Sequence, residues 1–117
     1  VTKTAEEVQA GLAQAVAAYG AKVALVSHQE PVYMDARGPW ITTLMEAYRE
    51  ETGDTAARPE VMGGGTYARA MGNVVAFGPI FPGREHTEHQ KNEHMAEEDF
   101  LALRPIYRKA LEKSLTL

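Results

Sequence analysis

The stretch GPWITTLMEAYREETG, residues 38–53, carries the clearest local fold signals in the chain. Pro39 suits the first turn of a helix, where its missing N–H costs nothing, and Gly53 suits the position just after a helix end. Between them, apolar side chains recur at helical spacing, at Trp40, Leu44, Ala47 and Tyr48. We therefore expect an amphipathic helix that buries one face, preceded by a linker at residues 35–38.

On the N-terminal side, Thr4 and Glu7 form a capping-box pattern before a predicted amphipathic helix over residues 4–19. The apolar run KVALVS, residues 22–27, then predicts a short buried strand that Pro31 ends. This helix and strand indicate half of a small α+β layer.

On the C-terminal side, two further short apolar stretches predict strands, at 58–62 and 74–77. A short helix is predicted over residues 66–71, directly after a glycine run. The last helix is predicted over residues 96–115, with acidic residues in its first turn, and Pro105 should kink or split it.

Composition narrows the class of protein. The chain has 117 residues, no cysteine and a net charge of −4, which argues against disulfides, thiolate metal sites and nucleic-acid binding. No apolar stretch predicts a membrane span and no secretion leader is visible, so we expect a cytoplasmic protein that does not bind membranes. Because the chain starts on Val1 in mid-pattern, we expect a fragment of a longer protein.

The segment GREHTEHQKNEH, residues 83–94, holds three of the four histidines, at His86, His89 and His94. Imidazole is the commonest protein metal ligand, and the intervening glutamates could orient it. On composition alone, a solvated acidic loop is the favoured interpretation, because the spacing matches no closed zinc signature. A small mononuclear site built on these three histidines is the alternative.

The run GGGT, residues 63–66, stands between a predicted strand and a predicted helix. Glycines allow a ligand to approach the backbone closely, and helix N-terminal N–H groups favour an anion such as a carboxylate. The alternative is a tight turn that needs positive φ, which is the favoured interpretation of an isolated GGG.

Three motifs in this order resemble a known family: GGGTYAR at 63–69, NVVAFGPIFPG at 73–83 and HQKNE at 89–93. Together they are similar to the PepV-type dipeptidases, in the wider clan of di-zinc peptidases that includes carnosinases, aminoacylases and desuccinylases. The resemblance spans essentially the whole chain. It implies an α/β fold, in which residues 1–34 are the end of an α+β, ferredoxin-like lid domain and residues 35–117 are the end of the catalytic α/β domain.

The resemblance also implies roles for particular residues. His89 would be a terminal ligand to one of two zinc ions, while His86 and His94 match no ligand position. Gly63 and Gly64 would offer backbone contacts near the carboxylate of a dipeptide substrate. The other metal ligands and the general base would lie upstream of this chain, so that the fragment alone is expected to be inactive.

Two other functions remain open at this point. One is a related amidohydrolase that removes acyl groups from amino acids. The other is a non-catalytic binding or dimerisation module. The expected partners are a dipeptide and the remainder of the parent chain, and self-association into a homo-oligomer is a further expectation for a fragment with exposed apolar faces.

Overall fold

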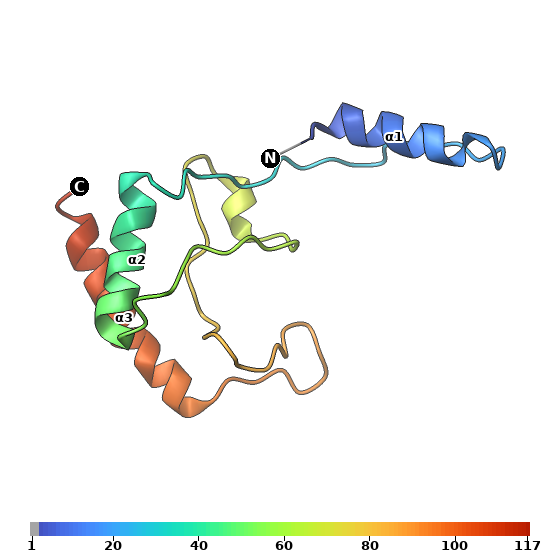
Figure 1. Cartoon of the computed structure of the whole chain (residues 1–117). Coiled ribbons are helices and arrows are strands. Elements are labelled where there is room, and N and C mark those ends of the chain that lie inside the picture. Colours follow the sequence, from blue (N-terminus) through green and yellow to red (C-terminus); the bar gives the residue numbers. More distant parts are fainter. Residues whose placement is uncertain (1–2) are drawn as a thin grey trace. The chain divides into compact units, whose positions relative to one another are not determined.

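The computed structural model describes residues 3–117 as helices joined by long irregular segments (Figure 1). The helices are α1 (Ala5–Ala17), α2 (Pro39–Thr52) and α3 (Glu97–Ser114), with a short 3-10 helix, η1 (Tyr67–Ala70). No β-strand forms within these residues. Val1 and Thr2, which open the expected lid segment, lie outside the described residues. None of the described helices is both long and apolar enough to span a bilayer.

The chain divides into two compact units. One consists of the chain up to Tyr33 together with Gly65–Val74, and the other of Met34–Gly64 together with Val75–Leu117. The first unit contains α1 and η1, and the second contains α2 and α3. The assignment of residues 1–34 to a lid and 35–117 to a catalytic domain stays a prediction.

The predicted helix ends are confirmed where local signals set them. Thr4 caps α1 in both directions: its N–H donates to Glu7 Oε2 at 2.7 Å, and its Oγ1 accepts from the Glu7 N–H at 3.2 Å. Pro39 opens α2, and Gly53 follows its end with φ of 73°. A glycine adopts this left-handed conformation without steric cost, which explains why the helix stops there.

Pro105 does not split α3, contrary to one of the two expected effects. The helix continues from Glu97 to Ser114 through Pro105. The proline removes only the N–H that would bond to the carbonyl of Leu101, one turn earlier. Leu101 is 59% exposed, so water can satisfy that carbonyl.

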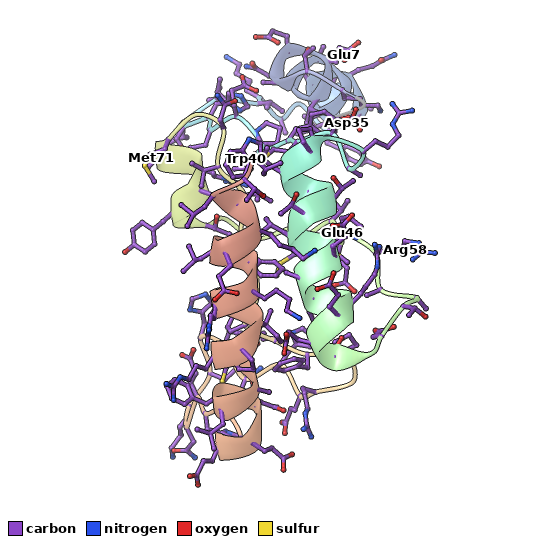
Figure 2. All side chains as sticks on the ribbon, turned by 90° about the vertical axis from the view of Figure 1, so that its left-hand side faces the viewer. Glu7, Asp35, Trp40, Glu46, Arg58 and Met71 are labelled. Carbon is purple, nitrogen blue, oxygen red and sulfur yellow. The ribbon has the colours of Figure 1, made fainter. Side chains whose placement is uncertain are left out.

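The core of the second unit lies between α2 and α3, which run side by side (Figure 2). Ala47 is fully buried, and the other buried apolar residues of the pair are Ile41, Leu103, Ile106 and Ala110. Lys113 pairs with Glu46, in the middle of α2, and Lys109 pairs with Glu51, near its end. The two helices are therefore antiparallel, with an apolar contact flanked by ion pairs.

The apolar residues of α3 and α1 are only partly buried. Leu103 and Ala110 of α3 are buried, but Phe100 is 67% exposed and Leu111 is 69% exposed. Helix α1 has no buried residue at all, although its spacing predicts an apolar face; Val8 is 47% exposed and Leu12 is 52% exposed. These faces have the pattern of buried surfaces without a partner within residues 3–117.

The three predicted strands do not form. The runs at 22–27, 58–62 and 74–77 are irregular, and no ladder of backbone hydrogen bonds joins them to another part of the described chain. A strand exists only when a neighbour supplies the opposite donors and acceptors. Within residues 3–117 the fold is therefore small and helical, and the expected α/β architecture is not realised in this chain by itself.

Candidate functional site

The histidine-rich loop between Phe81 and α3 is closed at its base. One guanidinium nitrogen of Arg84 lies 2.7 Å from both Glu98 Oε1 and Asp99 Oδ1, in the first turn of α3. These hydrogen bonds, with Asp99 the larger cause, raise the pKa of Arg84. Above this clamp, Thr87 Oγ1 donates to the His94 carbonyl at 2.9 Å and accepts from the His94 N–H at 3.2 Å.

The tip of the loop consists of two consecutive turns. The Gln90 N–H donates to the Thr87 carbonyl at 3.1 Å, and the Glu93 N–H donates to the Gln90 carbonyl at 3.2 Å. His89 and Asn92, the third residues of these turns, have φ of 61° and 65°. A type II turn needs positive φ at this third position, so residues 87–90 and 90–93 form two successive turns of this kind.

The rings of the four histidines differ in their hydrogen bonds. The His86 ring contacts Glu88 Oε1 at 3.1 Å, the His94 ring contacts the Asn92 carbonyl at 2.8 Å, and the His28 ring contacts Glu30 at 2.9 Å. Among the residues that the structure describes, no hydrogen bond reaches the His89 ring, and His89 is exposed. Its two ring nitrogens are therefore free to bind a ligand.

The histidines at and beside the loop tip, His86, His89 and His94, are exposed to solvent. The pKa of Glu88 lies below its ordinary value, first because a backbone N–H donates to the carboxylate and second because of the His86 ring. Within residues 3–117, no three His, Asp or Glu side chains gather closely enough to hold a metal ion. The three-histidine mononuclear site is therefore not formed, and a histidine of this loop that binds a metal needs further ligands from outside the described residues.

The glycine run has an open backbone. Neither Gly63 nor Gly64 has positive φ, and a Cβ added to either would meet no atom within 4 Å. The interpretation as a tight turn that needs positive φ is therefore wrong for this structure. Thr66 caps η1 by accepting from the Ala68 N–H at 3.0 Å, as the predicted helix start requires. Nothing within this chain's own structure explains why glycine stands at 63 and 64.

Within residues 3–117, the predicted site residues make no direct hydrogen bonds with one another. No hydrogen bond among the described residues joins Gly63 or Gly64 to His89. Tyr67, the first residue of η1, is 96% exposed. The side chain of Arg69 donates to Gln29 Oε1 at 3.3 Å and lies 3.4 Å from where a Cβ of Gly65 would stand.

The AFGP segment is held against α3 by contacts that the sequence did not reveal. The Tyr107 hydroxyl donates to the Phe77 carbonyl at 3.1 Å, and the two rings meet edge to face with centroids 5.9 Å apart. Burial of the hydroxyl raises the pKa of Tyr107. This contact fixes the segment that leads into the histidine-rich loop.

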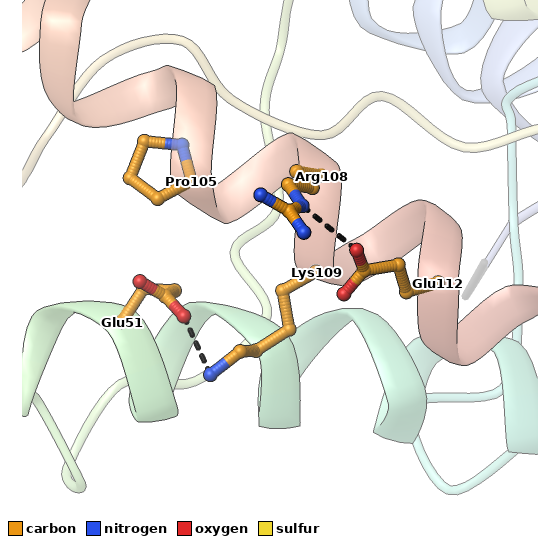
Figure 3. A pocket seen from close by; sticks show the side chains of 5 residues that line it. All are labelled: Glu51, Pro105, Arg108, Lys109 and Glu112. Atoms are coloured by element: carbon orange, nitrogen blue, oxygen red, sulfur yellow. Dashed lines mark hydrogen bonds and ion pairs between the residues drawn. The ribbon is translucent and has the colours of Figure 1, made fainter.

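A surface pocket of about 210 Å³ lies where α3 passes α2, lined by Glu51, Pro105, Arg108, Lys109 and Glu112 (Figure 3). Its charges already have partners. Arg108 pairs with Glu112 at 2.8 Å, and Lys109 pairs with both Glu51 and Glu50. The pocket therefore offers no unpaired charge to a substrate, and the lysine pairs serve the helix contact.

Comparison with known proteins identifies relatives of this chain. A sequence profile described as "Peptidase family M20/M25/M40" matches residues 3–113. A Staphylococcus epidermidis protein is 42% identical over 83 residues, and Staphylococcus haemolyticus and Staphylococcus aureus proteins are 38% and 40% identical over 96 and 93 residues. All three carry the name "Putative dipeptidase".

These matches cover 71% to 82% of this chain but only 18% to 20% of the relatives. The chain thus spans about a fifth of the length of the curated proteins it matches. No solved structure matches it at a significant level.

Proposed function

The chain belongs to the peptidase family M20/M25/M40, and we propose that it is the C-terminal portion of a zinc-dependent dipeptidase of the PepV type. The intact protein would hydrolyse the peptide bond of dipeptides with a water that bridges two zinc ions. The observation that carries the proposal is the family match over residues 3–113, together with relatives whose names state a dipeptidase. We also propose a cytoplasmic location.

His89 is the proposed metal ligand of this portion. Its ring is exposed and free of hydrogen bonds within the described chain, whereas the rings of His86 and His94 are engaged by neighbours in the same loop. A hydrogen bond to one ring nitrogen leaves the other nitrogen available to a metal, so the choice of His89 over His86 and His94 rests on the resemblance of HQKNE to the family motif. When bound, the metal pair would polarise the scissile carbonyl and supply hydroxide near neutral pH. His89 would hold one ion in place.

Gly63 and Gly64 are the proposed substrate-binding residues. Their backbone is exposed, and neither positive φ nor close packing requires glycine at these positions. A substrate carboxylate that approaches backbone N–H groups closely does require it, because a Cβ would occupy the space of the ligand.

The remaining ligands and the general base are proposed to lie in the remainder of the parent chain. One imidazole is not a two-metal site, so this chain by itself is proposed to be inactive. The remainder would also supply the neighbours that the runs at 22–27, 58–62 and 74–77 and the exposed faces of α1 and α3 need. Together they would form the α/β catalytic domain and the α+β lid.

A second function within the family is a deacylase or desuccinylase that acts on acylated amino acids. The names of the relatives favour the dipeptidase. A non-catalytic module is the alternative from another class, and the open apolar faces of α1 are its only support.

The test uses a chimaera in which the aligned stretch of the Staphylococcus epidermidis relative is replaced by this chain's sequence. We expect it to hydrolyse dipeptides with zinc. His89→Ala should lower kcat/KM at least about 100-fold, because a metal ion contributes several kcal/mol of transition-state stabilisation. His86→Ala changes the same residue type in the same loop and should leave activity within about threefold.

Two outcomes would reject the proposal. A folded chimaera that removes acyl groups but leaves dipeptides intact would favour the deacylase. Equal activity of the His89→Ala and His86→Ala chimaeras would show that His89 is not a ligand. Calorimetry on the 117-residue chain supplies a separate check: tight zinc binding that depends on both histidines would make it a metal-binding module in its own right.

A further inference from the structure

We propose that Glu93 is a positioning residue that holds His89 in the backbone conformation that presents its ring, an inference that rests on the proposed metal-binding role of His89. The Glu93 carboxylate reaches back along the loop. Its Oε2 accepts a hydrogen bond from the His89 N–H at 3.4 Å. The sequence placed Glu93 in the HQKNE motif but assigned it no role.

His89 needs such a partner because its conformation is unfavourable. With φ of 61° it lies in the left-handed region, where the Cβ of an L-residue comes too close to its own backbone. Histidine tolerates this region better than most residues, yet the loop must still hold it there. If φ changed to an extended value, the side chain would leave the turn in a different direction.

The nearby carbonyl groups of the loop accept hydrogen bonds from other donors, and the His89 N–H donates to Glu93. The Thr87 carbonyl accepts a hydrogen bond from the Gln90 N–H, and the Gln90 side-chain amide donates to the His86 carbonyl at 2.7 Å. Glu93 is anchored by its own N–H, which donates to the Gln90 carbonyl at 3.2 Å. The carboxylate therefore extends from a fixed turn to the only histidine N–H at the loop tip.

No other carboxylate of the loop accepts a hydrogen bond from the His89 N–H within the described residues. Glu88 contacts the ring of His86, and Glu85 makes no hydrogen bond to His89 in the described chain. At 3.4 Å the hydrogen bond from the His89 N–H to Glu93 is longer than a strong charge-assisted one, so its contribution is modest. Holding a ligand before the metal arrives reduces the freedom that is lost on binding.

The first experiment measures the geometry in the 117-residue chain by NMR. Glu93→Ala should accelerate hydrogen exchange of the His89 amide about threefold to tenfold and weaken its intraresidue amide-to-α-proton NOE, which is strong only at positive φ. Glu93→Gln keeps an acceptor oxygen and should stay near the wild type. Glu85→Ala removes the same charge from the same loop and should change neither signal.

The second experiment measures zinc affinity of the chimaera described above. Glu93→Ala should weaken it about tenfold, as loss of a residue that orients a ligand does, and Glu93→Gln should restore most of it. Equal losses in both variants would mean that Glu93 acts through its charge or binds the metal itself, and would overturn the proposal. So would a Glu93→Ala variant that behaves like Glu85→Ala.

Failure of the underlying function gives a different result. If His89→Ala leaves zinc affinity unchanged, His89 is not a ligand, whatever the NMR signals of its amide show. If His89→Ala abolishes binding while Glu93→Ala has no effect, the ligand assignment survives and only the positioning role is wrong.

Discussion

Replacing Gly78 with alanine should destabilise the chain by an amount that its contact with Tyr107 determines. Gly78 has φ of 76°, and an added Cβ would overlap the Tyr107 hydroxyl oxygen and lie 3.3 Å from the Cζ atom of that ring. The overlap forces the hydroxyl away from the Phe77 carbonyl. It also disturbs the edge-to-face contact of the two rings.

The magnitude follows from three contributions. The left-handed conformation costs alanine about 1–2 kcal/mol relative to glycine. Loss of the part-buried hydrogen bond costs about 0.5–1.5 kcal/mol, and loss of the aromatic contact costs a similar amount. Gly83 provides a matched control, since it has φ of 79° but no atom within 4 Å of the added Cβ. Gly83→Ala should therefore show the backbone cost alone, and Gly78→Ala about 1–3 kcal/mol more.

Urea denaturation followed by far-UV circular dichroism measures both free energies of unfolding. Tyr107→Phe serves as the second mutation of a double-mutant cycle, because it removes the overlapping oxygen. Gly78→Ala should cost less in that background than in the wild type. Equal losses for the two alanine variants, or no relief by Tyr107→Phe, would refute the steric argument.

Two further predictions concern the contact between α2 and α3. Ile106 is 3% exposed, so Ile106→Ala should lower the free energy of unfolding by about 2–5 kcal/mol. Phe100 is 67% exposed, so Phe100→Ala should change this free energy by about 0.5 kcal/mol or less. Thermal unfolding of both variants measures the two losses. Equal changes in melting temperature would contradict the placement of the core between α2 and α3. Hydrogen bonds from Lys113 first and Lys109 second lower the pKa of Glu50 below its ordinary value of 4.5. A lowered folded-state pKa stabilises the fold above pH 4.5, and this contribution is lost as the pH falls through the folded value. Between about pH 7 and pH 3, the melting temperature of Glu50→Gln should therefore fall less than that of the wild type.

Local sequence signals succeeded where their physical cause is local. The capping box at Thr4 and the ends of α2 at Pro39 and Gly53 depend on backbone groups within a few residues, so their patterns predicted the observed ends. The same holds for η1, which starts directly after Thr66. The short apolar runs failed as strand predictions because a strand depends on partners elsewhere in the structure, which residues 3–117 do not supply.

The residues of the candidate site stay a prediction from the sequence, and its geometry could not be predicted. The motifs pointed to His89, Gly63 and Gly64 through resemblance, while composition alone could not separate His89 from His86 or His94. In the structure, one nitrogen of the His86 ring contacts Glu88 and one nitrogen of the His94 ring contacts the Asn92 carbonyl, whereas no hydrogen bond within the described residues reaches the His89 ring. Nothing in the spacing of the residues foretold the Arg84 clamp on Glu98 and Asp99.

The sequence by itself determined the family and the ends of the helices, since these depend on residue identity and on neighbours close along the chain. Only the tertiary structure decided which apolar faces are buried and which histidine rings make hydrogen bonds. Ile106 is buried while Phe100 is exposed, although both lie on α3. The reason is that burial and hydrogen bonding depend on which side chains meet in space, and helical spacing specifies a face but not its partner.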